Sequence, residues 1–379
     1  MELSSEDALR LNVLISSSVA IRVDEGKMLV YGRSERGQEA MITLNPNCRS
    51  DQYIRAVKEL LSSMVLGSPG GYPVFLKRWT RMGQASDIRL HDLLKLGEPE
   101  AVVAVAGAQG LTDELAELAW WAMPNTENAR CMLTRECVVN GKMGKVLADF
   151  LMEFLPFEEE PGHVIESVSL VLQEGLIDEE ARIALWKRGK SKNVYRVGFL
   201  FRQPDKLPDP VVQRSDYPEH EQALTALAGR GNVMAASLLR VLSARGQTFI
   251  HAAEVILKKP SNQDVVVVFL ETLVAYCRDV RLSEFEFREM DTLISAVDAL
   301  QENEADGILQ QSPEYQAVSQ AIPELKAELA ALMIIAHTGE PIVRSIFAIT
   351  DAVGTVMRKK LEPVSKPLMQ QFAVLRGMT

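Results

Sequence analysis

Hydrophobic positions change their spacing near residue 85, and this change divides the chain. Before it, residues 5–15 follow the spacing of an amphipathic helix, and a second helical stretch begins near Tyr53 and ends at Gly67. Three short β-like stretches lie between them, at residues 19–23, 28–31 and 39–44. Turn-forming residues separate these stretches. The pattern predicts a small N-terminal α+β unit, residues 1–85, with a short antiparallel β-meander leaning on two helices.

From about residue 86 onward the pattern is helical, in stretches of mostly 10–16 residues separated by Gly, Pro and Asn. Several of these stretches carry helix-start signals. Residues 283–286 fit a capping box, in which a Ser hydroxyl and a Glu carboxylate bind each other's backbone amides. Pro313 follows Ser312 at a first helical position, and Asn262 precedes an apolar helix over residues 265–276.

Two segments of the helical part resemble each other. Residues 110–121 and 175–186 share Gly, Leu, Asp, Glu, two Ala and Trp at a constant offset of 65 residues. An offset of this size fits two helical hairpins of about 32 residues each, which is within the range of α-solenoid repeats. We expect the Ala and Trp positions to face a neighbouring helix. The fold class predicted is therefore mostly α, with a helical-repeat, HEAT-like body.

Proline marks one segment that has no hydrophobic period. Residues 204–218 contain Pro204, Pro208, Pro210 and Pro218, and we interpret them as a linker. The predicted organisation is an α+β unit at 1–85, a first helical-repeat segment at 86–203, the Pro-rich linker at 204–218 and a second helical segment at 219–379.

Composition places the protein among ordinary globular proteins. Of its 379 residues, 47% are apolar, and 41 Lys and Arg stand against 51 Asp and Glu, a formal net charge of −10. This balance argues against nucleic-acid binding by the whole surface, because phosphate neutralisation needs clustered cations. The four cysteines contain no CxxC pair, and the N-terminal residues are acidic where a secretory signal is basic. No apolar run approaches the roughly 18 residues that a membrane span needs. We therefore expect a cytoplasmic protein that binds no membrane.

Motifs that carry chemistry are absent from the sequence. The glycines of residues 67–73 lack the Lys and hydroxyl of a phosphate-binding loop, and Met234 stands where a dinucleotide fingerprint starting at Gly229 needs its third glycine. Five scattered histidines form no ligand set for a metal. The sequence therefore predicts no catalytic residue, no metal and no cofactor, and we expect no enzymatic activity.

Two basic stretches with interleaved aromatic residues are the candidate binding patch. Their residues are Lys77, Arg78, Trp79 and Arg81 in the first, and Trp186, Lys187, Arg188, Lys190, Lys192 and Arg196 in the second. Single-stranded RNA would suit such a patch, because the cations can bind its phosphates and the aromatic rings can stack on its bases. The competing interpretation is a solvated turn between helices, with Trp186 in the core.

The run SPGGYPVFLKRWTRMGQ, at residues 68–84, resembles the DsrS family, as do residues 96–105, 110–123 and 175–200. The resemblance implies an accessory protein encoded with the sulfur-oxidation genes of the reverse-acting dissimilatory sulfite reductase pathway, without a catalytic motif whose residues could be carried over.

Three functions remain open. The first is a non-enzymatic adaptor or regulator of sulfur oxidation that binds protein partners through its helices. The second is an RNA-binding regulator that uses the patches near Trp79 and Trp186. The third is an enzyme acting on a sulfur compound, which needs Cys131, Cys137 or Cys277 as a reactive thiolate.

Overall fold

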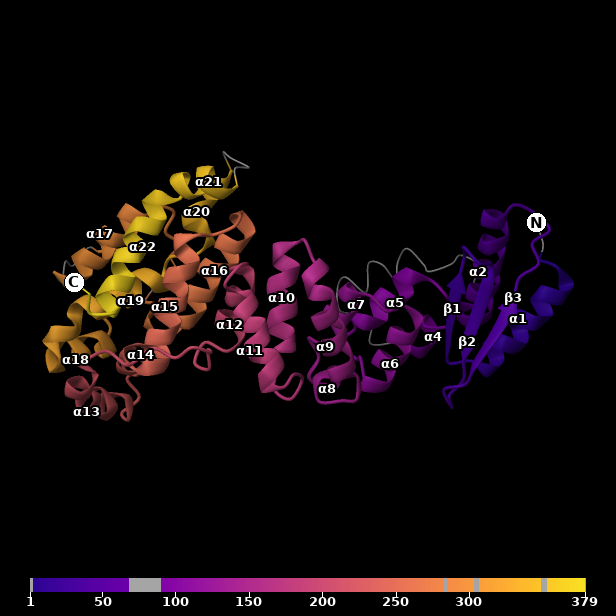
Figure 1. Ribbon diagram of the computed structural model, residues 1–379, viewed down its shortest axis with the longest axis horizontal. Coiled ribbons are helices and arrows are strands. Elements are labelled where there is room, and N and C mark those ends of the chain that lie inside the picture. Colours follow the sequence, from indigo (N-terminus) through magenta and orange to yellow (C-terminus); the bar gives the residue numbers. More distant parts are fainter. Residues whose placement is uncertain (1–2, 68–89, 283–284, 303–306, 349–352, 379) are drawn as a thin grey trace. The chain divides into compact units, whose positions relative to one another are not determined.

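A computed structural model describes residues 3–67, 90–282, 285–302, 307–348 and 353–378. These residues form two compact units, each described here by itself. Unit 1 comprises Met1–Pro156 and Gln173–Ile177, and unit 2 comprises Phe157–Leu172 and Asp178–Thr379. Helices dominate both units, and one three-stranded sheet lies near the N-terminus (Figure 1). The fold class predicted from the sequence, mostly α with a small N-terminal α+β part, is confirmed.

The elements of unit 1 are α1 (Ser5–Ser17), β1 (Ala20–Asp24), β2 (Leu29–Arg33), β3 (Glu39–Thr43), α2 (Ser50–Leu66), α4 (Leu90–Leu93), α5 (Pro99–Ala106), α6 (Asp113–Ala122), α7 (Thr126–Met132), α8 (Glu136–Val139) and α9 (Met143–Phe154). The α-helices of unit 2 are α10 (Pro161–Val171), α11 (Glu179–Arg188), α12 (Val194–Arg202), α13 (Tyr217–Ala228), α14 (Val233–Leu242), α15 (Ala244–Lys258), α16 (Gln263–Tyr276), α17 (Met290–Gln301), α18 (Pro313–Ala321), α19 (Lys326–Ala336), α20 (Glu340–Phe347), α21 (Gly354–Lys360) and α22 (Glu362–Leu375). The 3₁₀ turns η2 (Leu155–Phe157), η3 (Arg278–Val280) and η4 (Pro323–Leu325) lie between them.

The sheet of unit 1 is the predicted meander, in the order β1-β2-β3 and antiparallel throughout. Because side chains alternate along a strand, one face carries Ile21, Val30 and Ile42, and this face packs on α1 and α2 around the buried Tyr53 and Leu61. Helix α2 ends where the sequence predicts, since Gly67 takes the left-handed conformation (φ 69°) that a glycine adopts without steric cost.

Helix-start signals read from the sequence are confirmed wherever the structure describes them. Asn262 caps α16, its side-chain oxygen accepting from the Val265 amide at 3.0 Å. Ser312 caps α18 in the same way, and Pro313 occupies the first turn of that helix. The predicted capping box at residues 283–286 begins outside the described residues.

The two similar segments differ in their environments. Their helices, α6 and α11, belong to different units. Ala119 is buried, whereas its counterpart Ala184 is exposed, so the expectation that the alanines face a neighbouring helix is wrong for Ala184. Trp121 lies near β1, and Trp186 is in a helical core. The two helices also begin differently, because Thr112 caps α6 through the Leu115 amide, whereas Asp178, the counterpart of Asp113, caps α11 through the Ala181 amide.

The predicted Pro-rich linker is an ordered part of unit 2. Its backbone amides at Val211 and Arg214 donate to Thr248 Oγ1 (2.9 Å) and to the Leu242 carbonyl (3.0 Å). Asp209, between two prolines, adopts φ 59°, and its carboxylate accepts from the Trp186 indole N–H at 3.0 Å. Residues 204–218 thus form a strap fixed to α11, α14 and α15. The domain boundaries near residues 85 and 210 stay predictions.

Within the described residues, no single helix is long and apolar enough to cross a membrane. The segments Pro323–Ala336 and Glu340–Phe347 reach that length and composition only together, across a 55° bend.

Candidate anion-binding surface

The structure describes the second of the two predicted basic stretches. Lys77, Arg78, Trp79 and Arg81 lie outside the described residues. In the second stretch, Trp186 is buried, with 4% of its surface exposed, and it packs edge-on against Phe199 at a centroid distance of 5.1 Å. Its ring is therefore part of the core of unit 2, as the competing interpretation expects.

Arg196 is held beside this tryptophan. Its guanidinium carbon lies 5.3 Å from the centre of the Trp186 ring, and burial lowers the pKa of the arginine from its usual value. The side-chain stem crosses Gly189, where a Cβ atom would come within 2.6 Å of Arg196 Cγ. Gly189 is thus required for the close approach that fixes Arg196 at the turn between α11 and α12.

The other cations of this turn are exposed. Lys187, Arg188, Lys190 and Lys192 make no ion pair with any carboxylate in the described part of the chain. The side chain of Asn193, at the end of the turn, donates to the Lys259 carbonyl at 2.8 Å. This bond brings the turn next to the C-terminus of α15, which ends in two further exposed lysines, Lys258 and Lys259.

A groove of about 700 Å³ continues from Lys258 between the end of α15, helix α21 and the start of α22. Its cations are Lys258, Arg358, Lys359 and Lys366, and its floor includes Leu257, Pro260, Leu361 and Met369. The end of α21 places Arg358, Lys359 and Lys360 in one helical turn, where cations interact favourably with the helix dipole. We call the turn at 187–192, Arg196, Lys258, Lys259 and the groove the basic surface.

Carboxylates on the basic surface are already paired. Glu254 binds Lys258 (2.9 Å) and Arg376, and although partial burial raises its pKa, these cations lower it overall. Glu362 binds Lys366 at 2.6 Å. The pKa of His251, on the same face of α15, is lowered by burial and then by Arg376, so His251 is neutral at pH 7. The surface therefore keeps a strong positive excess in a chain of net charge −10.

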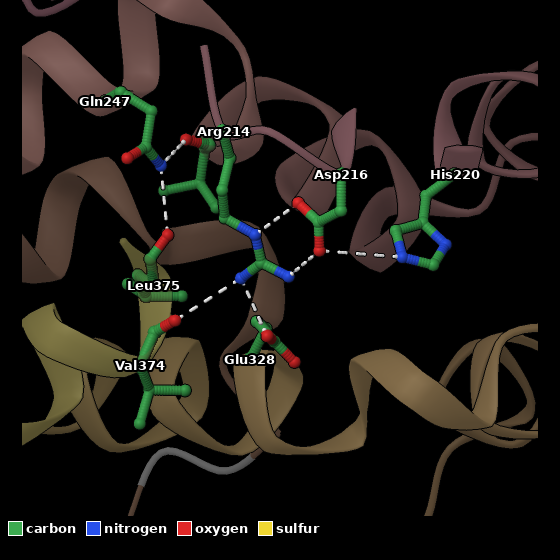
Figure 2. A network of polar contacts seen from close by, with 8 residues as sticks. Arg214, Asp216, His220, Gln247, Glu328, Val374 and Leu375 are labelled. Carbon is green, nitrogen blue, oxygen red and sulfur yellow. Dashed lines mark hydrogen bonds and ion pairs between the residues drawn. The ribbon is translucent and has the colours of Figure 1, made fainter. Parts of the chain in front are cut away.

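A buried ionic network joins the strap to α19 and to the end of α22 (Figure 2). Arg214, on the strap, binds Asp216 through both carboxylate oxygens and Glu328 of α19 at 2.7 Å. It also donates to the Val374 carbonyl at the end of α22 (3.3 Å). We call these contacts the Arg214 network.

Gln247 extends this attachment from α15. Its amide donates to the carbonyls of Val241 (2.9 Å) and Leu375 (3.0 Å). The strap, the start of α15, α19 and the end of α22 are thereby fixed to one another.

Among the residues that the structure describes, no three His, Cys, Asp or Glu side chains are placed to hold a metal ion. Cys277 is buried, and burial raises the pKa of its thiol to about 12, so it is not a reactive thiolate. Cys137 is exposed, with its sulfur 3.1 Å from the Leu111 carbonyl.

Sequence reasoning found the turn at 187–192 but missed the groove beside it. The groove cations lie about 70 to 180 residues further along the chain, so no local pattern connects them with the turn. Arg358–Lys360 was interpretable from sequence only as a helix end. One signal was available, namely that α11, α15 and α21 all end in cations.

No protein-family model matches the chain, and neither curated proteins nor solved structures include a significant match. The resemblance to the DsrS family therefore stays a prediction.

Proposed function

We propose that the protein is a non-catalytic adaptor that docks an acidic segment of a protein partner on its basic surface. The observation that carries the proposal is the set of exposed cations without ion pairs on a chain that is acidic as a whole. In water at physiological salt, charges act over a Debye length of about 8 Å. A short acidic segment would therefore interact with the basic surface and little with the acidic remainder.

Two features favour a protein segment over RNA, namely the burial of the aromatic rings in the second basic stretch and the negative net charge of the chain. Single-stranded RNA binding depends on bases stacking on exposed aromatic side chains, and Trp186 and Tyr195 are both buried. The apolar floor of the groove offers contacts for aliphatic side chains that alternate with the acidic ones. A long polyanion would also meet repulsion from the rest of a −10 chain.

The pathway in which such an adaptor acts is a proposal that rests on the sequence resemblance alone. It assigns the protein to dissimilatory sulfur oxidation, in the cytoplasm, with sulfur-metabolism proteins as partners.

The test is a fluorescence-anisotropy titration of the full chain with a labelled peptide of alternating Glu and Leu, at 50 and 150 mM salt. The variant reverses four charges of the basic surface, Lys190→Glu, Lys192→Glu, Lys259→Glu and Lys359→Glu. A matched control reverses four exposed cations of unit 1, Lys142→Glu, Lys145→Glu, Arg49→Glu and Arg55→Glu. We expect the variant to bind at least about tenfold more weakly than wild type, and the control to bind like wild type.

A second arm uses a labelled single-stranded RNA of mixed sequence under the same conditions. Equal loss of peptide binding in both variants would overturn the assignment to the basic surface. RNA that binds more tightly than the peptide, with loss in the basic-surface variant, would overturn the adaptor proposal in favour of RNA binding.

A further inference from the structure

The second face of the sheet in unit 1 carries an arginine that no described carboxylate neutralises. Arg22 of β1 lies beside Tyr31 of β2, with its guanidinium carbon 4.6 Å from the centre of the Tyr31 ring and 5.2 Å from that of Trp121 on α6. One guanidinium nitrogen donates to the Trp121 carbonyl at 3.3 Å. The rings and this bond hold the planar group in one orientation, and further N–H groups remain for a ligand.

The Trp121 ring is itself held in position. The Trp121 indole N–H donates to the Glu39 carboxylate, on the edge strand β3. A second link between α6 and the sheet joins Glu117 to Arg33. The Trp121 ring is thereby attached to β3, and α6 to β2, which keeps the ring beside Arg22 and makes the arginine a preorganised cation.

Arg22 lines a cavity of about 480 Å³, within the size range of small-molecule sites. Its walls are apolar at Val23, Pro99, Val102 and Met123. The cavity thus combines one fixed cation, Arg22, and an exposed one, Lys27, with hydrocarbon walls.

Carboxylates also line this cavity, and they restrict the charge of a ligand. Asp24 lies 3.5 Å from Lys27, and Glu25 binds Lys58 at 2.7 Å, so both carboxylates have cations of their own. Glu98 is a third. Two cations, Arg22 and Lys27, stand against these three carboxylates in the lining. A ligand with two or more negative charges, such as phosphate, would therefore meet more repulsion than a single carboxylate, which needs only Arg22.

We infer that this cavity binds a small monocarboxylate with an apolar body, its carboxylate on Arg22 and its hydrocarbon part against Val102 and Met123. A guanidinium fork matches the two oxygens of a carboxylate, and the pair forms charge-assisted hydrogen bonds. The inference concerns unit 1 and does not depend on the basic surface of unit 2.

The experiment titrates the full chain with hexanoate and follows the indole ¹⁵N–¹H signal of Trp121, assigned with a Trp121→Phe variant. We expect a saturable shift with wild-type protein and a dissociation constant at least about tenfold higher for Arg22→Met, as loss of a charge-assisted hydrogen bond implies. Arg22→Lys keeps the charge without the fork and is expected to lie between them. Arg10→Met removes an arginine from α1, on the opposite face of the sheet, and is expected to bind like wild type.

Three further probes decide between specific and general effects. Hexan-1-ol and hexylamine share the hydrocarbon chain, and inorganic phosphate shares only the negative charge. None of them should give the saturable Trp121 shift.

Met123→Trp fills the cavity and leaves Arg22 in place, so it is expected to abolish hexanoate binding even if Arg22→Met does not fold. Hexanoate binding that survives in folded Arg22→Met, or in Met123→Trp, would overturn the inference, as would the absence of any saturable shift in wild type.

Discussion

Arg214 offers the sharpest test of how unit 2 is stabilised. The perturbation is Arg214→Met, which removes the charge and keeps a side chain of similar length. Only 7% of the Arg214 side chain and 10% of the Glu328 side chain are exposed, and Glu328 Oε2 is buried without a hydrogen-bond partner. The substitution therefore leaves one buried carboxylate without a counter-charge. Asp216, 29% exposed, can still reach water.

The magnitude follows from this burial. Removing one partner of a buried ion pair typically costs about 3–5 kcal/mol, most of it the penalty of the charge left behind. For a cooperative unit of 150–250 residues, each kcal/mol lowers the melting temperature by about 2–4 °C, so a fall of roughly 6–20 °C is expected. Replacing both Arg214 and Glu328 by Met removes the unpaired charge, and about half or more of the lost free energy should return.

Differential scanning calorimetry and urea unfolding measure both effects. The matched control is Arg344→Met, which breaks an exposed pair with Glu340 one helical turn away and should cost no more than about 0.5 kcal/mol. If Arg214→Met costs no more than this control, or if the double variant is as unstable as the sum of the single ones, the reasoning from burial is refuted.

Three other predictions concern single side chains. Iodoacetamide at pH 8 should label Cys137 in the native protein and leave Cys277 unlabelled until urea unfolds the chain, and mass spectrometry would contradict this by finding labelled native Cys277. The hydrogen bonds from the Arg214 guanidinium lower the pKa of Asp216, so its stabilisation is complete above the unfolded value of 3.8 and lost as pH falls through the folded pKa. The difference in unfolding free energy between wild type and Asp216→Asn should shrink between pH 5 and 2.5, and a constant difference would be inconsistent with this linkage. Gly97→Ala should destabilise unit 1 by about 1–3 kcal/mol, because φ is 65° and the new Cβ would lie 2.7 Å from Val23 Cγ2; unchanged thermal unfolding would contradict it.

Local signals in the sequence predicted local structure well. The three strands, the helix ending at Gly67 and the caps at Asn262 and Ser312 depend on residues within a few positions of one another. Such short-range chemistry is the same wherever a segment lies in the fold.

Long-range contacts explain what the sequence did not predict. Residues 204–218 have the composition of a linker, yet Arg214 has partners 114 and 160 positions away. The groove likewise joins α15 to α21 and α22. Trp186 has the sequence context of an exposed stacking ring, and its burial depends on Phe199 and Asp209. Nothing within a few residues of these positions specifies their partners.

The order of synthesis gives the Arg214 network a consequence for biogenesis. Unit 1 is complete once residue 177 has been made, whereas Arg214 and Gln247 wait for Val374 and Leu375. At about 5–20 residues per second, the 160 residues between Arg214 and Val374 take about 8–30 s. Throughout that interval the strap and α15 lack their attachment to α22, so the nascent chain carries a finished unit 1 and an unfinished unit 2. Chaperones and proteases would therefore encounter unit 2, and not unit 1, as the vulnerable part of a growing chain.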